Sequence, residues 1–141
     1  MIRGNGMRYA TEKQLAAHAK TLGEGTDGDA LSELIRLTQS PSPLVRRIAA
    51  SSIGKLSGVA ETNAAVAALR PLLGDTHPQV RQYAAKALGT YGCAAAPVLP
   101  ALRDMLRNPA ESDYVKRSVT AAGLLIKTAL EIAGRHTAQT C

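Results

Sequence analysis

Four polar side chains are the part of this sequence best suited to binding. Three of them lie two positions after a valine of a repeated pattern, and the fourth lies close beside them; the set is Arg47, Gln82, Arg117 and Lys86. On a helix of 3.6 residues per turn, a residue two positions after the valine lies about 200° round the axis from it. The spacing therefore predicts a polar, mostly basic strip that binds a partner. An exposed helix face that carries charge only for solubility is the alternative interpretation.

Catalysis and metal binding have little support in the sequence. His18, His77 and His136 are scattered, and none has a Cys, Asp or Glu at metal-ligand spacing. The segment GEGTDG, residues 23–28, lacks the preceding strand and the lysine that a phosphate-binding loop requires. We therefore expect no enzyme activity, no catalytic residues, no metal site and no cofactor.

Composition and charge narrow the class of protein. A chain of 141 residues is long enough to bury a core as one domain, and it contains neither Trp nor Phe. The acidic and basic side chains of residues 1–29 balance, so the net charge of +6 comes from the rest of the chain and favours an acidic partner. No apolar run is long enough to span a membrane, and the N-terminus lacks the apolar core of a signal peptide, so a cytoplasmic protein is expected.

The elements that must position these side chains form an internal repeat. Residues 78–89 read PQVRQYAAKALG, and residues 43–54, 35 positions upstream, read PLVRRIAASSIG. A weaker third copy, another 35 positions on, is marked by Val115, Lys116, Val119 and Ala122. In the first two copies the stripe residues recur at i, i+3, i+4, i+7 and i+8, which is the spacing of one helix face, and all but Ser52 are apolar. A fixed period of this size is typical of stacked helical repeats that share one continuous core.

The predicted organisation is a single all-α domain, residues 1–141. Its parts are a flexible lead-in (1–9), an N-terminal capping helix (10–23), three repeats (29–58, 61–92 and 94–133) and a flexible tail (134–141). Thr11 and Gln14 have capping-box spacing at the start of the first helix, and Gly23 is expected to end it. Asp29 is expected to cap the next helix, and Thr62 or Asn63 the first helix of the second repeat. The two tyrosines of the second stripe, Tyr83 and Tyr91, are predicted to lie in the core.

The pattern P-x-V-R-x-x-A-A-x-x-ϕ-G, in which ϕ is apolar, resembles the HEAT repeat, particularly the short HEAT-like type known from phycobilisome lyases. The third copy departs from it, with Asp113 for the proline and Leu124 for the glycine. The tetratricopeptide and ankyrin patterns fit worse, because their signature residues are missing. The resemblance implies a right-handed α-solenoid of about three antiparallel helix pairs, whose second helices line a concave binding surface.

HEAT repeats commonly pair a turn aspartate with an arginine six residues later, and these pairs stack into a ladder. Asp75 and Arg81 have this spacing, whereas Ser40 stands six residues before Arg46. In the third unit Lys116 replaces the arginine, and a loop with two extra residues displaces the acidic partner. The resemblance therefore implies an incomplete structural ladder of Arg46, Asp75, Arg81 and Lys116. Direct ligand binding by these residues is the alternative.

Three hypotheses for function follow, and the partner and oligomeric state stay open. The first is a non-catalytic scaffold or adaptor that binds a protein on the concave face. The second is nucleic-acid binding through the basic strip, as in HEAT-like DNA glycosylases, although the lack of Trp and Phe argues against base stacking. The third, implied by the resemblance alone, is a phycobilisome-type chromophore lyase or a lyase subunit.

Overall fold

Seven α-helices and two short 3₁₀ segments account for most of the described chain. The computed structural model describes residues 10–25, 27 and 29–135, so the predicted lead-in and residues 136–141 of the predicted tail lie outside it. The elements in order are α1 (Glu12–Glu24), α2 (Ala30–Leu37), α3 (Pro43–Lys55), α4 (Thr62–Leu69), η2 (Arg70–Gly74), α5 (Pro78–Thr90), η3 (Gly92–Val98), α6 (Leu99–Arg107) and α7 (Asp113–Arg135). The described residues contain no strand, which confirms the all-α prediction.

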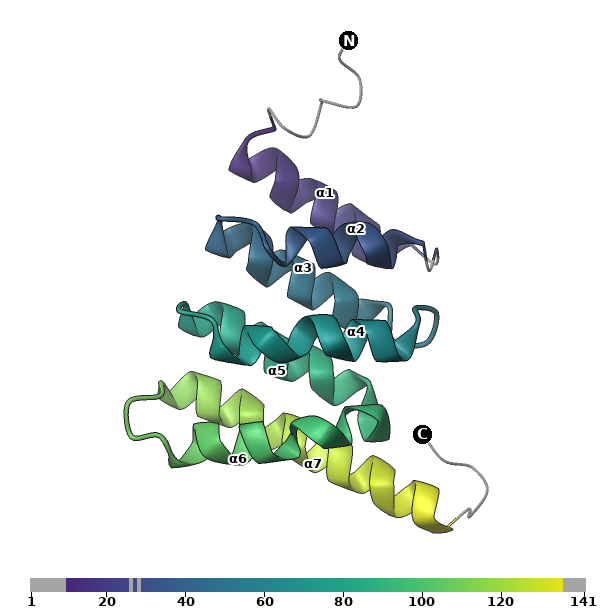
Figure 1. Ribbon diagram of the computed structural model, residues 1–141, viewed down its shortest axis with the longest axis vertical. Helices are drawn as coiled ribbons and strands as arrows, with labels where there is room; N and C mark the ends of the chain where they lie inside the picture. The colour runs from purple at the N-terminus through teal and green to yellow at the C-terminus, as the bar shows by residue number, and fades with distance from the viewer. Residues whose placement is uncertain (1–9, 26, 28, 136–141) are drawn as a thin grey trace.

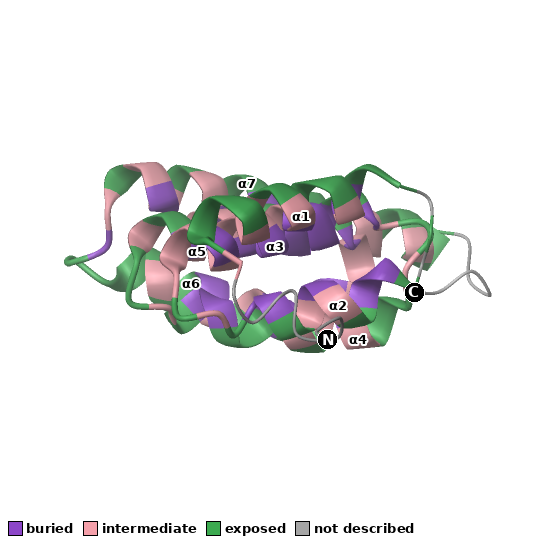
Figure 2. Ribbon diagram, turned by 90° about the horizontal axis from the view of Figure 1, so that it is seen from above, coloured by how far each residue is buried: buried purple, intermediate pink, exposed green. Residues whose placement is uncertain are grey.

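The helices form two layers (Figure 1). Helices α1, α3, α5 and α7 stack one on the next, and α2, α4 and α6 form the second layer beside them. The buried residues face one another between the layers, as the purple segments in Figure 2 show. Val45, Val80 and Val115 are all fully buried, at corresponding places in α3, α5 and α7. The repeat pattern thus predicted the architecture correctly: the chain is a HEAT-like α-solenoid.

Helix starts follow the local chemistry of the sequence, with two exceptions. At α1 the predicted capping box is present, because the Thr11 hydroxyl accepts the backbone N–H of Gln14 at 3.1 Å and the Gln14 side chain accepts that of Thr11 at 2.8 Å. At α2, Asp29 occupies the N-cap position as predicted, and at α4 the predicted cap is wrong. Asp29 makes no side-chain capping bond, and at α4 it is Glu61 that accepts the N–H of Ala64, at 2.6 Å.

Small residues let neighbouring helices of the first layer approach closely. A Cβ added at Gly54 would lie 3.0 Å from Cα of Ala87, and one at Gly89 would lie 3.1 Å from Cα of Ala122. Gly23, predicted to end α1, lies inside it, because its role is a helix crossing: an added Cβ would lie 2.5 Å from Cβ of Ser52. The glycines therefore hold the repeats in contact backbone to backbone.

One of the two predicted core tyrosines is buried as expected. Tyr91 ends the stripe of α5, and its hydroxyl donates to the carbonyl of Ile53 at 2.7 Å. Burial raises the pKa of Tyr91 to about 12, because the phenolate would lose its hydration. Tyr83 is only half-buried and lies at the outer surface of the first layer.

Candidate functional site

The arginine ladder links the repeats through the turns that precede α3, α5 and α7. Arg46 donates through Nε and Nη2 to the two carboxylate oxygens of Asp75, at 2.8 and 3.1 Å. Its Nη1 donates to the carbonyl of Ser40, six residues earlier, at 2.9 Å. Arg46 therefore joins the turn of its own repeat to the turn of the next one.

Arg81 repeats this arrangement one unit further on. Its Nη1 donates to the backbone carbonyl of Asp75 at 2.7 Å, and its Nε and Nη2 donate to the carboxylate of Glu111 at 2.8 and 2.7 Å. The residue six positions before each arginine thus supplies a carbonyl, whereas the carboxylate comes from the following turn. Glu111 was not among the predicted ladder residues, because it lies in the irregular loop with two extra residues.

Both carboxylates are buried, and both are held ionised. The side chains of Asp75 and Glu111 are 8% and 4% exposed. Burial would raise the pKa of Asp75, but the bonds from Arg46 and the His77 N–H, with the charges of both side chains, outweigh it and lower the pKa. The hydrogen bond from Arg81 lowers the pKa of Glu111 against the opposing effect of burial, with help from the Ser112 N–H.

The last predicted member of the ladder, Lys116, occupies the arginine position of α7. It is half-buried, and its charge lowers the pKa of Glu111. A shallow depression at the start of α7 is lined by Lys116, Arg117, Asp113 and Thr120. Among the described residues, the chain of arginine bonds runs from Ser40 to Glu111, one step before this lysine.

A groove between α3 and α5 brings two cations from different helices together on one aromatic ring. The ring of Tyr83 lies between two cations: the Arg47 guanidinium is 5.5 Å from its centroid, and the Lys86 ammonium is 5.0 Å from it. Contacts of this kind fix the cations over the ring while leaving their N–H groups available to anions. Of the four predicted binding residues, the structure brings Arg47 and Lys86 together, from two different helices.

Hollows lie on either side of Tyr83 along this groove. One, of about 390 Å³, is lined by the first turns of α3 and α5 together with Arg47, His77 and Tyr114. The other, of about 240 Å³, is lined by Ser51, Gly54, Lys55, Tyr83, Lys86, Ala87 and Thr90. No carboxylate lines either hollow. We call these two hollows with Arg47, Tyr83 and Lys86 the α3–α5 groove; it presents cations and a ring with no neutralising acid among its lining.

The other two predicted binding residues lie elsewhere. The Gln82 side chain is half-buried and donates to the hydroxyl of Ser118 on α7 at 3.2 Å, so it joins α5 to α7. Arg117 is exposed on α7, in the depression beside Lys116. Gln82 thus contributes to the α5–α7 junction and Arg117 to the depression at the start of α7, whereas Arg47 and Lys86 share the ring of Tyr83. Tyr83, which was predicted to be core, is the residue that organises the two that do meet.

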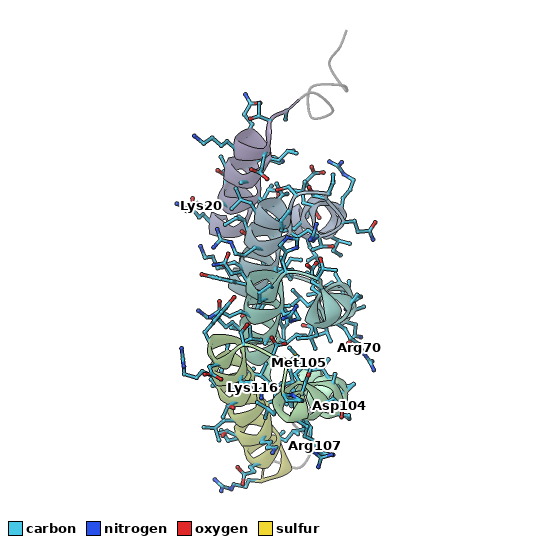
Figure 3. The ribbon with its side chains drawn as sticks, turned by 90° about the vertical axis from the view of Figure 1, so that its left-hand side faces the viewer. Lys20, Arg70, Asp104, Met105, Arg107 and Lys116 are labelled. Atoms are coloured by element: carbon cyan, nitrogen blue, oxygen red, sulfur yellow. The ribbon has the colours of Figure 1, made fainter. Side chains whose placement is uncertain are left out.

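The two layers differ in how their charges are arranged. Figure 3 shows Arg70, Asp104 and Arg107 on the side of the α2, α4 and α6 layer, where cations and an acid are interspersed. The α3–α5 groove lies in the other layer, and no carboxylate lines it.

Within the part of the chain that the structure describes, no three His, Cys, Asp or Glu residues come close enough to hold a metal ion. None of the described helices is both long and apolar enough to cross a membrane. The α3–α5 groove is therefore the strongest candidate site.

Comparison with known families agrees with the geometry. Residues 58–123 match the family described as HEAT repeats, and residues 30–60 match the single HEAT repeat. The two matches together span residues 30–123, which contain α2 to α6 and the first half of α7. A search of curated proteins found no match to the chain.

Proposed function

Since the chain belongs to the HEAT repeat family, whose repeats generally serve as protein-interaction scaffolds, we propose that it is a non-catalytic adaptor that binds an acidic segment of a protein partner in the α3–α5 groove. The observation that carries the proposal is the pair of cations on Tyr83. Arg47 and Lys86 come from different repeats and are held within 5.5 Å of one ring. Their charge is not neutralised by any carboxylate in the groove's lining.

The fit of such a partner follows from the physical chemistry of the groove. Asp or Glu side chains can accept hydrogen bonds from the Arg47 guanidinium and the Lys86 ammonium, and charge-assisted bonds are the stronger kind. The apolar walls around Leu44, Pro78 and Tyr114 suit aliphatic side chains of the same segment. Because Tyr83 already positions both cations, less side-chain entropy is lost on binding.

Nucleic acid is the second candidate, because phosphate would also be attracted to these cations. Proteins that bind single strands without sequence preference stack successive bases on several aromatic side chains. The groove offers two tyrosines, Tyr114 and Tyr83, and the ring of Tyr83 is already in contact with Arg47 and Lys86; the chain has no Trp or Phe. The geometry therefore favours a protein ligand over a nucleic acid.

A charge reversal confined to the groove tests this proposal. We expect Arg47→Glu/Lys86→Glu to reduce capture of the partner from the native extract, with affinity falling by about tenfold or more, because attraction is converted into repulsion. The matched control, Arg70→Glu/Arg107→Glu, makes the same charge change on the opposite layer and should leave capture intact. Circular dichroism checks that both variants keep their helices.

Two outcomes would contradict the proposal. Equal loss of capture in both double variants would mean that general charge, not the groove, governs association. Binding of duplex or single-stranded oligonucleotides by the wild-type protein, steeply weakened by salt and lost in the groove variant alone, would favour the nucleic-acid reading instead.

A further inference from the structure

The stack ends at α6 and α7 in a face that differs from every internal junction. Inside the stack, α3 packs on α5 and α5 packs on α7, each through a glycine: Gly54 and Gly89. The residue 35 positions after Gly89 is Leu124, and its side chain is 66% exposed on α7. A leucine here is too large for the close helix contact that the glycines allow, so another unit of the same kind cannot stack in the same way.

The preceding position shows the opposite change, from large to small. Ile53 in α3 and Leu88 in α5 are fully buried, and the residue at the same place in α7 is Gly123. A Cβ added at Gly123 would meet no atom within 4 Å. The missing side chain leaves a groove of about 320 Å³ between α6 and α7.

The floor of this α6–α7 groove is apolar and open to solvent. It is lined by Leu99, Leu102, Leu106, Val119, Gly123 and Leu124. Leu106 is 39% exposed, whereas Leu73, its counterpart 33 residues earlier, is 6% exposed beneath the next repeat. The groove thus presents the kind of surface that the internal repeats cover with a neighbouring helix.

The charges at the rim indicate what covers it. Arg103 on α6 and Lys127 on α7 line the groove, and no carboxylate does. We propose that the α6–α7 groove is a second docking site, for an amphipathic helix of another protein that inserts a large apolar side chain over Gly123 and places acidic residues against Arg103 and Lys127. Helix-in-groove binding of this kind uses anchors at i, i+3, i+4 and i+7.

A second copy of the chain fits this surface less well. Two α6–α7 faces brought together about a two-fold axis would place Arg103 and Lys127 of each copy near those of the other, so like charges would meet. The exposed side chains of α1, at the other end of the stack, are Glu12, Lys13, Gln14, Ala17, Lys20, Thr21 and Glu24, so acid and base are mixed there. Its two leucines, Leu15 and Leu22, are only partly exposed and pack against the core. An acidic amphipathic helix satisfies both the apolar floor and the basic rim.

The probe for the experiment is a labelled synthetic peptide with leucines at i, i+3, i+4 and i+7 and glutamates at most other positions. Fluorescence anisotropy should give a Kd at least about tenfold lower for it than for a lysine counterpart or one with serines for leucines. Gly123→Leu restores the residue type of the internal repeats, fills the hollow and should weaken binding by about 10- to 100-fold. The charge-matched control Lys13→Glu/Lys20→Glu, exposed on α1 at the other end of the stack, should leave the affinity unchanged.

A second measurement, the amide resonances of the wild-type protein, does not depend on whether the Gly123→Leu variant folds. In the wild-type protein, the amide resonances of Thr120, Gly123 and Leu124 should shift on addition of the peptide. Absence of binding, equal affinity for the three peptides, or shifts confined to the α3–α5 groove would overturn the proposal. So would a wild-type dimer in sedimentation velocity that Gly123→Leu dissociates, because the occupant would then be a second copy.

Discussion

Replacing Arg81 with methionine is expected to lower the free energy of unfolding by about 3 kcal/mol at neutral pH. Methionine keeps much of the apolar stem but removes both bonds to Glu111 and the bond to the carbonyl of Asp75. Glu111, 4% exposed, then keeps the hydrogen bond from the N–H of Ser112 at 2.9 Å but has lost both bonds from its cationic partner. Urea titration followed by circular dichroism measures the change.

The pH dependence of that loss identifies its cause. The pKa of Glu111 is lowered in the folded protein, so the pair's contribution is fully present above the ordinary glutamate pKa and disappears as pH falls through the folded value. The difference between wild type and variant should therefore shrink below about pH 5. Arg81→Met/Glu111→Leu should recover most of the stability, because no buried charge remains unpaired. An equal loss in the double variant, or a loss independent of pH, would contradict this account.

Replacing Gly54 with leucine is expected to lower the free energy of unfolding by about 2–3 kcal/mol, because it overpacks the junction between the first two repeats. The added Cβ alone lies 3.0 Å from both Cα and Cβ of Ala87. Since Cα belongs to the backbone of α5, the clash cannot be relieved by a rotamer change, and the helices must separate. Thermal and urea unfolding measure the effect.

Gly123→Ala is the matched control for this effect. Like Gly54 it is a glycine inside a first-layer helix, but nothing lies within 4 Å of an added Cβ. Its substitution should raise stability by about 0.5–1 kcal/mol, because alanine favours the helix. If Gly54→Leu were as stable as the wild type, the close approach of α3 and α5 would not be a property of the folded protein.

The repeat and its register could be predicted from the sequence because they depend on local spacing. The 35-residue period placed Val45, Val80 and Val115 in equivalent positions, and all three are buried. The capping box at Thr11 involves residues three positions apart, so it too could be found without the fold. The cap of α4 was missed because Glu61, Thr62 and Asn63 lie side by side at its start, and local sequence does not choose among them.

The candidate site could be predicted only in part, because it depends on how helices lie side by side. Helical spacing placed Arg47 and Lys86 on the outer surface, but spacing within one helix contains no information on how neighbouring helices pack. The contact of Lys86 with Tyr83 lies within α5, but the offset of α3 against α5 decides that Arg47 meets the same ring. The packing of α5 on α7 brings Gln82 against Ser118. Glu111 was missed for a related reason: a residue in an irregular loop has no fixed position in a repeat.

The most direct test of the central claim is site-specific photocrosslinking in the native extract. A photoreactive phenylalanine analogue at Ser51, which lines the α3–α5 groove, is compared with one at Ala67, exposed on α4. Crosslinks from position 51 to a peptide rich in Asp and Glu, absent from position 67 and lost when Arg47→Glu/Lys86→Glu is added, are the predicted result. Crosslinks found only from position 67, or from position 51 to nucleic acid, would contradict the account.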